Sequence, residues 1–231
     1  MSDPDDAPDP ETNVALAAVA HEIKNALGPL AMTLQLVERQ VLAGQPVEAE
    51  DLSFSRAQVR RLASLVDDLL DQARADLGAL AFRPRRADLC AVVSEAVATF
   101  RRGKPANVAL DLPGAPVRAS VDVGRMQQVL VNLLENAVRY SPAGSAVTVA
   151  VKQPAPARAR IEVRDRGPGL SAEERAQIFD RFVRGAASQG TSGLGLGLYL
   201  CRAIVEQHGG TLGVDSVAGA GATFWIDLET S

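Results

Sequence analysis

A histidine, a carboxylate and an amide lie close together near the start of the chain. Glu22 directly follows His21, and Asn25 stands four residues after it, so on a helix Asn25 shares the face of His21 whereas Glu22 does not. A neutral imidazole is a nucleophile at pH 7, and a carboxylate can fix its tautomer. The residues fit a nucleophilic histidine or an ordinary histidine on a helix surface, and taken alone they favour the ordinary one.

A second polar feature is a row of amides at helical spacing. Gln128, Asn132 and Asn136 recur every fourth residue, which places them on one helical stripe although Asn is a poor helix former. Amide oxygens can ligate a hard cation such as Mg²⁺, and Arg139 could meet phosphate oxygens. The alternative is a solvated helix face without a ligand.

A carboxylate closes one of the predicted strands. By the two-residue period, Asp165 shares the face of Ile161 and Val163, which we expect to be buried. An ionised carboxylate there needs a hydrogen-bond donor, and Gly167 and Gly169 leave room for a ligand to approach the backbone. Asp165 could thus contact an amino group such as that of adenine, or cap a tight Gly-Pro-Gly turn.

Alternating glycines stand directly before a helical pattern. Gly193, Gly195 and Gly197 strip side chains from a backbone whose N–H groups would face an anion at a helix N-terminus. The spacing fits neither the P-loop nor the dinucleotide fingerprint, and a purely structural glycine turn is the alternative. His208, near the end of that helix, is predicted to compensate the helix dipole rather than to bind a ligand.

The elements that position these residues change character along the chain. A heptad pattern predicts a helix of about 30 residues from Thr12 and a second helix from about Ala49 that ends before Gly78. Such a hairpin cannot bury its apolar seam alone, so we expect a second copy to complete a dimeric four-helix bundle.

The rest of the chain alternates between helical and strand patterns. Because the strands mostly come as hairpins, we expect an α+β protein whose second part is an α/β sandwich with a mixed sheet. The predicted helices cover 89–100, 125–139, 171–182 and 196–207, and the predicted strands cover 108–112, 117–121, 145–152, 158–164, 211–216 and 223–228.

In this order the segments resemble the catalytic core of the sensor histidine kinases of two-component signalling. The resemblance covers about residues 14–229. It rests on five motifs. The phospho-acceptor box is matched by residues 21–25, the asparagine box by 128–137, the adenine-pocket motif by 165–169, the phenylalanine box by 179–182, and the lid glycines by 193–197.

The resemblance implies a role for each matched residue. His21 would be phosphorylated by ATP with Glu22 accepting the other ring N–H, and Asn25 would orient a hydrolytic water. Asn136 would ligate Mg²⁺. The residues implied in ATP binding are Asn132, Asn136, Arg139, Tyr140, Asp165, Gly167, Gly169, Arg184, Gly193, Leu194, Gly195, Leu196 and Gly197.

The sequence departs from the family pattern at two places. Ala26 stands where Pro is usual, and Pro29 follows three residues later, which predicts a helix kink with a shifted pivot. Arg139 stands where Lys is common, which keeps the charge but changes the donor geometry.

The resemblance also implies partners: a homodimer and a response regulator whose aspartate receives the phosphoryl group. Two alternatives are a dimeric scaffold that binds a regulator without kinase activity, and a serine kinase or ATPase of the same superfamily. An intact set of ATP motifs argues against the scaffold, and the histidine-bearing hairpin argues against the serine kinase or ATPase.

Charge and composition narrow the remaining classes. The net charge is −4, and the first eleven residues hold five of the 28 acids and no base, so residues 12–231 carry 24 basic against 23 acidic side chains. This balance argues against a nucleic-acid binder, and the absence of an apolar run of about 20 residues predicts a cytoplasmic chain without a membrane anchor.

The domain boundaries follow from these patterns. We expect a disordered acidic leader over 1–11, a dimerisation and phosphotransfer hairpin over 12–78, and an ATPase or kinase domain over 83–229. Eleven leader residues are too few for an input domain, which predicts that a separate sensor protein supplies the signal or that the chain is cut from a longer one.

Overall fold

A computed structural model of the chain describes residues 10–78, 80–103, 106–185, 187 and 194–230. Contacts between residues divide the chain into two compact units. The first comprises the chain up to Ala73 together with 190–194, and the second comprises the rest.

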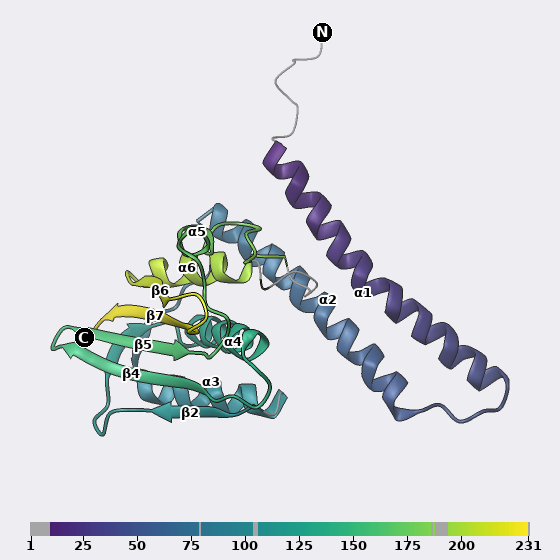
Figure 1. Cartoon of the computed structure of the whole chain (residues 1–231), viewed down its shortest axis with the longest axis horizontal. Coiled ribbons are helices and arrows are strands. Elements are labelled where there is room, and N and C mark those ends of the chain that lie inside the picture. The colour runs from purple at the N-terminus through teal and green to yellow at the C-terminus, as the bar shows by residue number, and fades with distance from the viewer. Residues whose placement is uncertain (1–9, 79, 104–105, 186, 188–193, 231) are drawn as a thin grey trace, which may run out of the picture. The chain divides into compact units, whose positions relative to one another are not determined.

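The first unit is built from two long helices, as the heptad pattern predicts. Helix α1 spans Pro10–Leu42 and helix α2 spans Ala49–Asp76, whose last turn belongs to the second unit. Helix α1 begins two residues before the predicted Thr12, so the predicted leader overlaps it at its end, and residues 1–9 lie outside the described part. The helix runs unbroken through Pro29 (Figure 1).

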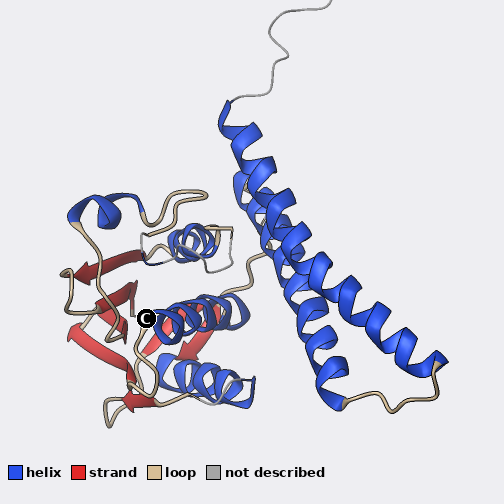
Figure 2. Ribbon diagram, turned by 45° about the vertical axis from the view of Figure 1, so that its right-hand side comes forward, coloured by secondary structure: helices blue, strands red, loops and turns tan. Residues whose placement is uncertain are grey.

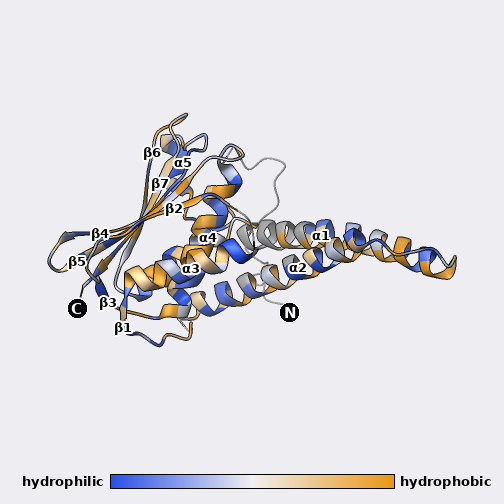
Figure 3. Cartoon of the chain, turned by 90° about the horizontal axis from the view of Figure 1, so that it is seen from below, coloured by the Kyte–Doolittle hydropathy of each residue, from blue (hydrophilic) through white to orange (hydrophobic). Residues whose placement is uncertain are grey.

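Both helices leave large apolar side chains exposed. Hydrophobic residues recur along α1 and α2 between hydrophilic ones (Figure 3), which is the pattern that the heptad seam predicts. The exposed set on α1 and α2 comprises Leu27, Met32, Leu34, Leu36, Val41, Leu42, Leu52, Phe54, Val59, Val66 and Leu70.

The second unit is a mixed sheet with helices on one face (Figure 1, Figure 2). The sheet has five strands in the order β2-β4-β5-β7-β6. Its elements are β2 (Val108–Asp111), β4 (Val147–Ala155), β5 (Arg158–Arg164), β6 (Thr211–Ser216) and β7 (Ala222–Glu229), with α3 (Leu89–Gly103), α4 (Val123–Tyr140) and α6 (Gly197–Gln207) packed against them.

Strand pairing confirms the mixed sheet and places two strands that are consecutive in the sequence in different sheets. Strand β2 pairs parallel with β4, and the other pairs of the sheet are antiparallel. The predicted strands 108–112 and 117–121 are not partners, since β3 (Arg118–Val121) pairs with β1 (Arg85–Asp88) in a separate two-stranded sheet. The sequence did not predict β1 because its four residues show no apolar alternation.

The core of the second unit lies between the sheet and the helices. Alternate residues of β5, Ala159, Ile161 and Val163, are at most 1% exposed, as the two-residue period predicts. From α4, Leu130 and Leu133 pack into the same cluster. Burial of each such leucine stabilises the fold by about 1.5–3 kcal/mol.

The helix predicted over 171–182 is shorter in the structure. Helix α5 spans Ala172–Gln177 and begins with a capping box between Ser171 and Glu174. The chain then turns, and Phe182 takes a left-handed conformation with φ of 61°, which a bulky residue rarely adopts. Apolar spacing alone does not predict where this helix ends.

Within the described residues, none of the helices is long and apolar enough to cross a membrane.

Candidate functional site

Helix α4 carries the predicted amide stripe and orients two of its members. Asp122 caps the helix by accepting the N–H of Arg125 at 3.1 Å. Further along, Asn136 Nδ2 donates to Asn132 Oδ1 at 3.2 Å. Because that bond uses the nitrogen of the Asn136 amide, its Oδ1 is left as the atom that could ligate a cation.

The start of α6 packs directly on this stripe. A Cβ at Gly197 would lie 2.4 Å from Asn132 Nδ2 and 2.9 Å from its Oδ1, so only glycine allows this approach without displacing the amide. Among the described residues, no side chain caps the N-terminus of α6. The first N–H groups of this helix therefore present a positive helix end beside Asn132, which suits an anion.

Asp165 is buried at the end of β5, as predicted. Its side chain lies in a residue that is 7% exposed, and its Oδ1 accepts the N–H of Gly167 at 2.7 Å and of Ala222 at 3.2 Å. Burial raises the pKa of Asp165 above its usual range, and these two hydrogen bonds oppose the shift only in part. The backbone donors satisfy one carboxylate oxygen, which leaves the other as an acceptor for a ligand.

The loop after Asp165 touches the end of α4. A Cβ at Gly167 would lie 2.9 Å from the carbonyl oxygen of Tyr140, so the loop and the helix meet through their backbones. Asn132, Asn136 and Tyr140 are spaced four residues apart along α4. The structure therefore brings the amide stripe, the start of α6 and the Asp165 loop together within the second unit.

Other predicted ligand residues differ in exposure. Arg139 and Arg184 are exposed, whereas Leu194 and Leu196 are 7% and 1% exposed and contribute apolar side chains to the interior. Gly193 lies outside the described residues.

The glycine turn is held by backbone contacts. Gly195 has φ of +71°, and a Cβ there would lie 2.7 Å from the carbonyl oxygen of Val183. The N–H of Phe182 donates to the carbonyl of Gly195 at 3.1 Å. Gly195 thus has a structural role in this turn, and the anion site at these glycines stays a prediction.

The predicted nucleophile lies on α1 in the first unit. His21 and Asn25 are both exposed, and the helical spacing places them on one face. The side chain of Glu22 lies outside the described part. An exposed imidazole can be reached by a second protein. This access is necessary if the histidine is to accept a phosphoryl group and pass it on.

Sequence reasoning missed two residues that hold the Asp165 loop. A Cβ at Gly221 would lie 2.4 Å from the carbonyl oxygen of Asp165. Ser216 Oγ accepts the N–H of Leu170 at 2.9 Å and donates to the carbonyl of Gly221 at 2.7 Å. The run of glycine and alanine from 218 to 222 was the one signal in the sequence for a close backbone approach. It does not indicate which segment lies against that run.

The structure places His208 at the C-terminal end of α6, as predicted, and gives it a second partner. Its Nε2 accepts the N–H of Asp122, at the start of α4, at 2.9 Å. Its Nδ1 lies 2.7 Å from the carbonyl oxygen of Ile204 and donates to it. The ring therefore joins two helices.

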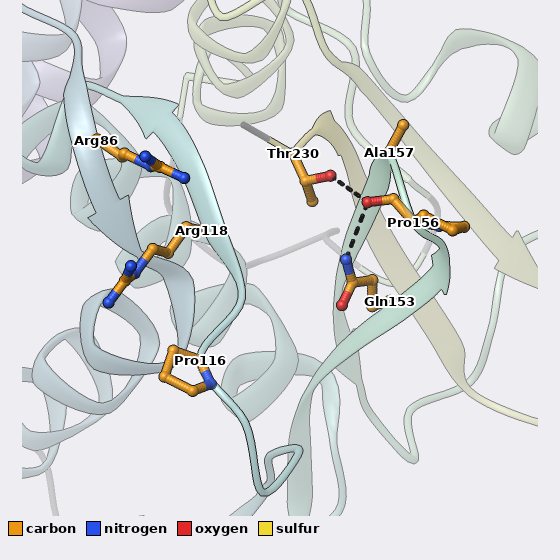
Figure 4. Close-up of a pocket in the computed structure, with 7 residues that line it drawn as sticks. All are labelled: Arg86, Pro116, Arg118, Gln153, Pro156, Ala157 and Thr230. Carbon is orange, nitrogen blue, oxygen red and sulfur yellow. Dashed lines mark hydrogen bonds between the residues drawn. The ribbon is translucent and has the colours of Figure 1, made fainter.

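A separate pocket of about 570 Å³ lies where β1 and β3 meet the turn between β4 and β5 (Figure 4). Arg86 and Arg118 line it, and the carbonyl of Pro156 accepts hydrogen bonds from Thr230 Oγ1 at 2.7 Å and from Gln153 Nε2 at 3.1 Å. This turn precedes β5, whereas Asp165 follows it, so the pocket is not part of the candidate site.

Two family descriptions match the chain in sequence order. Residues 13–78 match the His Kinase A (phospho-acceptor) domain. Residues 121–231 match the Histidine kinase-, DNA gyrase B-, and HSP90-like ATPase. The two matches contain, respectively, His21 and all the site residues of the second unit named above.

Named kinases are similar to this chain over most of its length. The chain is 31% identical over 218 residues to the adaptive-response sensory kinase SasA of Synechococcus sp. (strain JA-3-3Ab), covering 92% of this chain and 58% of that protein. It is 31% identical over 217 residues to the signal transduction histidine-protein kinase/phosphatase MprB of Mycobacterium avium (strain 104), covering 90% and 41%. The chain thus spans about half the length of these relatives.

A solved structure confirms the fold. The Acinetobacter baumannii histidine kinase AdeS is 25% identical, with a TM-score of 0.69 over 91% of this chain and 98% of that chain. Full-length ShkA in complex with AMPPNP is 26% identical, with a TM-score of 0.66 over 95% of this chain and 46% of that chain. With its phospho-acceptor domain followed by its ATPase domain, the chain belongs to the sensor histidine kinases.

Proposed function

We propose that this chain is an ATP-dependent kinase that phosphorylates its own His21 and passes the phosphoryl group to an aspartate of a separate response regulator. The observation that carries the proposal is the convergence of Asp165, the Asn132–Asn136 pair and the start of α6 in one unit. The same chain exposes His21 on α1. We assign phosphotransfer and dimerisation to 12–78 and catalysis to 83–229.

The residues present fit an adenine nucleotide. Oδ2 of Asp165, the oxygen that does not accept the backbone N–H groups, would accept a hydrogen bond from the adenine amino group. The N–H groups at Gly197 and the following residues would hold phosphate oxygens. Arg139 and Arg184 are exposed side chains that could reach the same phosphates. The similar kinase ShkA was solved in complex with AMPPNP, an ATP analogue, which supports a nucleotide in this type of domain.

The amide pair fits a magnesium ion held together with the nucleotide. Asn136 Oδ1 would be the protein ligand, and Asn132 fixes the orientation of that amide through its hydrogen bond. Mg²⁺, when bound, neutralises charge on the phosphates during transfer. Within the described residues no group of three His, Cys, Asp or Glu side chains is placed to hold a metal ion.

The first transfer needs little covalent chemistry from the protein. The lone pair of one ring nitrogen of His21 attacks the γ-phosphorus of ATP, the bond to the β–γ bridging oxygen breaks, and ADP leaves. The proton on the other ring nitrogen passes to the carboxylate of Glu22. Positioning and charge neutralisation supply most of the rate in such reactions.

The second transfer requires a partner protein. The N–P bond of phosphorylated His21 breaks as a carboxylate oxygen of the regulator's aspartate forms a new bond to phosphorus. Asn25, on the face of His21, would orient water when the regulator is dephosphorylated, and the M. avium relative is named a kinase/phosphatase. The exposed apolar side chains of α1 and α2 support a homodimer.

Labelling with γ-labelled ATP tests the proposal. We expect acid-labile label on the unaltered chain and a loss of at least about 1,000-fold in His21→Ala, with nucleotide affinity unchanged because His21 is not in the ATP-binding unit. Asp165→Asn should lose label through weaker nucleotide binding instead.

Each other outcome contradicts the proposal in a distinct way. Acid-stable label that survives His21→Ala would indicate a serine kinase. Hydrolysis of ATP without any label would indicate an ATPase. Absence of nucleotide binding in the unaltered chain would favour a scaffold that binds a regulator.

A further inference from the structure

The segment Leu80–Arg83, between α2 and β1, is bound to the ends of two helices. Gln207 Nε2, in the last turn of α6, donates to the carbonyl of Leu80 at 3.1 Å. The N–H of Arg83 donates to Oδ2 of Asp122, the residue that caps α4, at 2.8 Å. Between them, the ring of Phe82 meets the ring of His208 edge to face, with centroids 4.7 Å apart.

His208 is the centre of this cluster. Its ring accepts the N–H of Asp122 at Nε2 and donates to the carbonyl of Ile204 at Nδ1, so it fixes the C-terminal end of α6 to the N-terminal end of α4. Asp122 in turn accepts from both Arg125 and Arg83. The imidazole thus stands between the helix ends and the segment that follows α2.

The segment is also anchored by packing. Leu80 is 7% exposed and belongs to the hydrophobic core of the second unit. The anchoring continues a contact that α2 begins, since Ala75, just before the end of this helix at Asp76, also packs against the same core. All contacts of the cluster lie within the second unit.

We propose that His208, Asp122 and Gln207 form a latch that holds Leu80–Arg83 and thereby sets how the ATP-binding unit is tethered to the His21-bearing hairpin. The proposal rests on the proposed kinase function. His208 is a positioning residue in this scheme, because it acts on the tether and does not touch the nucleotide.

The latch acts on phosphoryl transfer more than on nucleotide binding. Asp122 precedes Asn132 by ten residues of α4, about 15 Å along the helix, so the loss of the latch leaves the nucleotide residues in place. The same loss frees Phe82 and Arg83 from the helix ends and weakens the hold on the segment that follows α2, which lowers the effective concentration of the ATP-binding unit at His21.

Two variants of His208 in the full chain separate the contributions. His208→Phe keeps a ring against Phe82 but removes the acceptor for Asp122, whereas His208→Gln keeps a polar acceptor at about the reach of Nε2. Gln207→Ala removes the bond to Leu80 and leaves His208 intact, so it serves as a second test if His208→Phe folds poorly.

Three readouts test the latch. In His208→Phe, the amides of Asp122 and Arg83 should exchange hydrogen at least about tenfold faster, and chymotrypsin should cleave more readily after Phe82. The rate of label transfer to His21 at saturating ATP should fall about three- to tenfold, the size expected from lost hydrogen bonds, while nucleotide affinity stays within about twofold. His208→Gln should restore most of the rate, and Gln207→Ala should lose less than His208→Phe.

The contrary outcomes are distinct. Unchanged exchange at Arg83 and unchanged cleavage after Phe82 in both His208→Phe and Gln207→Ala would overturn the latch. An equal loss of nucleotide affinity and transfer rate would also overturn it, because His208 would then support the fold of the domain alone. If the unaltered chain never labels His21, the kinase proposal fails, whereas exchange and cleavage still decide whether the segment is latched.

Discussion

The two units of this chain satisfy their apolar residues in different ways. In the ATP-binding unit, side chains such as Leu130 and Ile161 are 1% exposed and pack within the chain. In the hairpin, side chains at the same kind of periodic position, such as Leu34 and Val59, are 50% and 54% exposed. One unit is complete in a single chain, and the other requires a second surface.

The polar site residues of the two units also differ in burial. Asp165, which is proposed to recognise a ligand, is buried, and removal from water strengthens a specific hydrogen bond and raises the cost of an unpaired one. His21 is exposed. It is proposed to react first with ATP held by the ATP-binding unit and then with an aspartate of the response regulator. In the proposed function, the buried residue therefore recognises the ligand and the exposed residue takes part in transfer.

The largest expected effect is on the hairpin. Leu34→Glu should raise the dissociation constant of the homodimer more than about 100-fold, because a buried leucine contributes about 1.5–3 kcal/mol and a symmetric interface contains it twice. Sedimentation over a range of protein concentrations measures the dimer.

The ATP-binding unit offers a matched control for that substitution. Leu110 is a partly exposed apolar residue of β2, at 39%, and Leu110→Glu should leave the dimer intact. If both variants dissociated equally, or if neither dissociated, the exposed apolar side chains of α1 and α2 would not form the dimer interface.

The second prediction concerns the buried core. Leu130→Ala should lower the free energy of unfolding of the ATP-binding unit by about 2–5 kcal/mol, since it opens a cavity in a packed interior. The loss should not depend on protein concentration, whereas the loss in Leu34→Ala should. Thermal unfolding at several protein concentrations distinguishes the two, and a concentration-dependent loss in Leu130→Ala would break the comparison.

The third prediction tests the contact between α6 and the amide stripe. Gly197→Ala would bring a Cβ to 2.4 Å from Asn132 Nδ2, and the short amide must move, which breaks its bond to Asn136. Nucleotide affinity should fall about tenfold, close to the loss of one good hydrogen bond. Isothermal titration with an ATP analogue measures it.

Gly124 provides the control on the same helix as Asn132. A Cβ there would lie 3.6 Å from its nearest neighbour, Asp122 Oδ1, which is an ordinary contact. Gly124→Ala should bind nucleotide normally and gain up to about 1 kcal/mol in helix stability. An unaltered affinity in Gly197→Ala would show that the amide tolerates displacement.

Most of the architecture could be predicted because local patterns determine it. The two-residue alternation of Ala159, Ile161 and Val163 defined β5 with the observed bounds, and it also placed Asp165 on the buried face. The heptad spacing defined both helices of the hairpin. These patterns are local consequences of which side of an element is buried.

Features that depend on distant segments could not be predicted. The pairing of β2 with β4 and of β3 with β1 is decided by the packing of the whole sheet, and nothing in residues 108–121 records it. In the same way, the role of His208 depends on Asp122, which is 86 residues away. A histidine before two glycines at a helix end fits a local dipole argument equally well.

The smallest predicted effect is the pH dependence that Asp165 causes. As the pH falls, nucleotide affinity should decrease, whereas the contribution of Asp165 to the free energy of unfolding should increase. Burial raises the pKa of Asp165, with hydrogen bonds from Gly167 and Ala222 opposing the shift in part. In the proposed function, the ionised carboxylate is the form that accepts a hydrogen bond from the adenine amino group. Nucleotide affinity should therefore begin to fall, by about two- to threefold at first, at a higher pH than an ordinary aspartate would give.

The folding contribution of the same group runs the other way. A carboxyl whose pKa is higher in the folded than in the unfolded state favours folding most when protonated, so its contribution is present at low pH and is lost as the pH rises through the folded-state pKa. Asp122 gives the internal contrast: desolvation raises its pKa, but the N–H groups of Arg83 and Arg125 outweigh this and lower it. Its contribution is lost as the pH falls.

Titration of nucleotide binding in the unaltered chain and in Asp165→Asn measures the binding arm. The variant should bind weakly and without the acid dependence, because its amide does not titrate in this range. Unfolding of Asp165→Asn and Asp122→Asn across the same pH range measures the folding arm, and the difference from the unaltered chain should change with pH in opposite directions for the two variants. A common direction would show that Asp165 is not destabilised by its burial, and the link between burial and recognition would fail at its central residue.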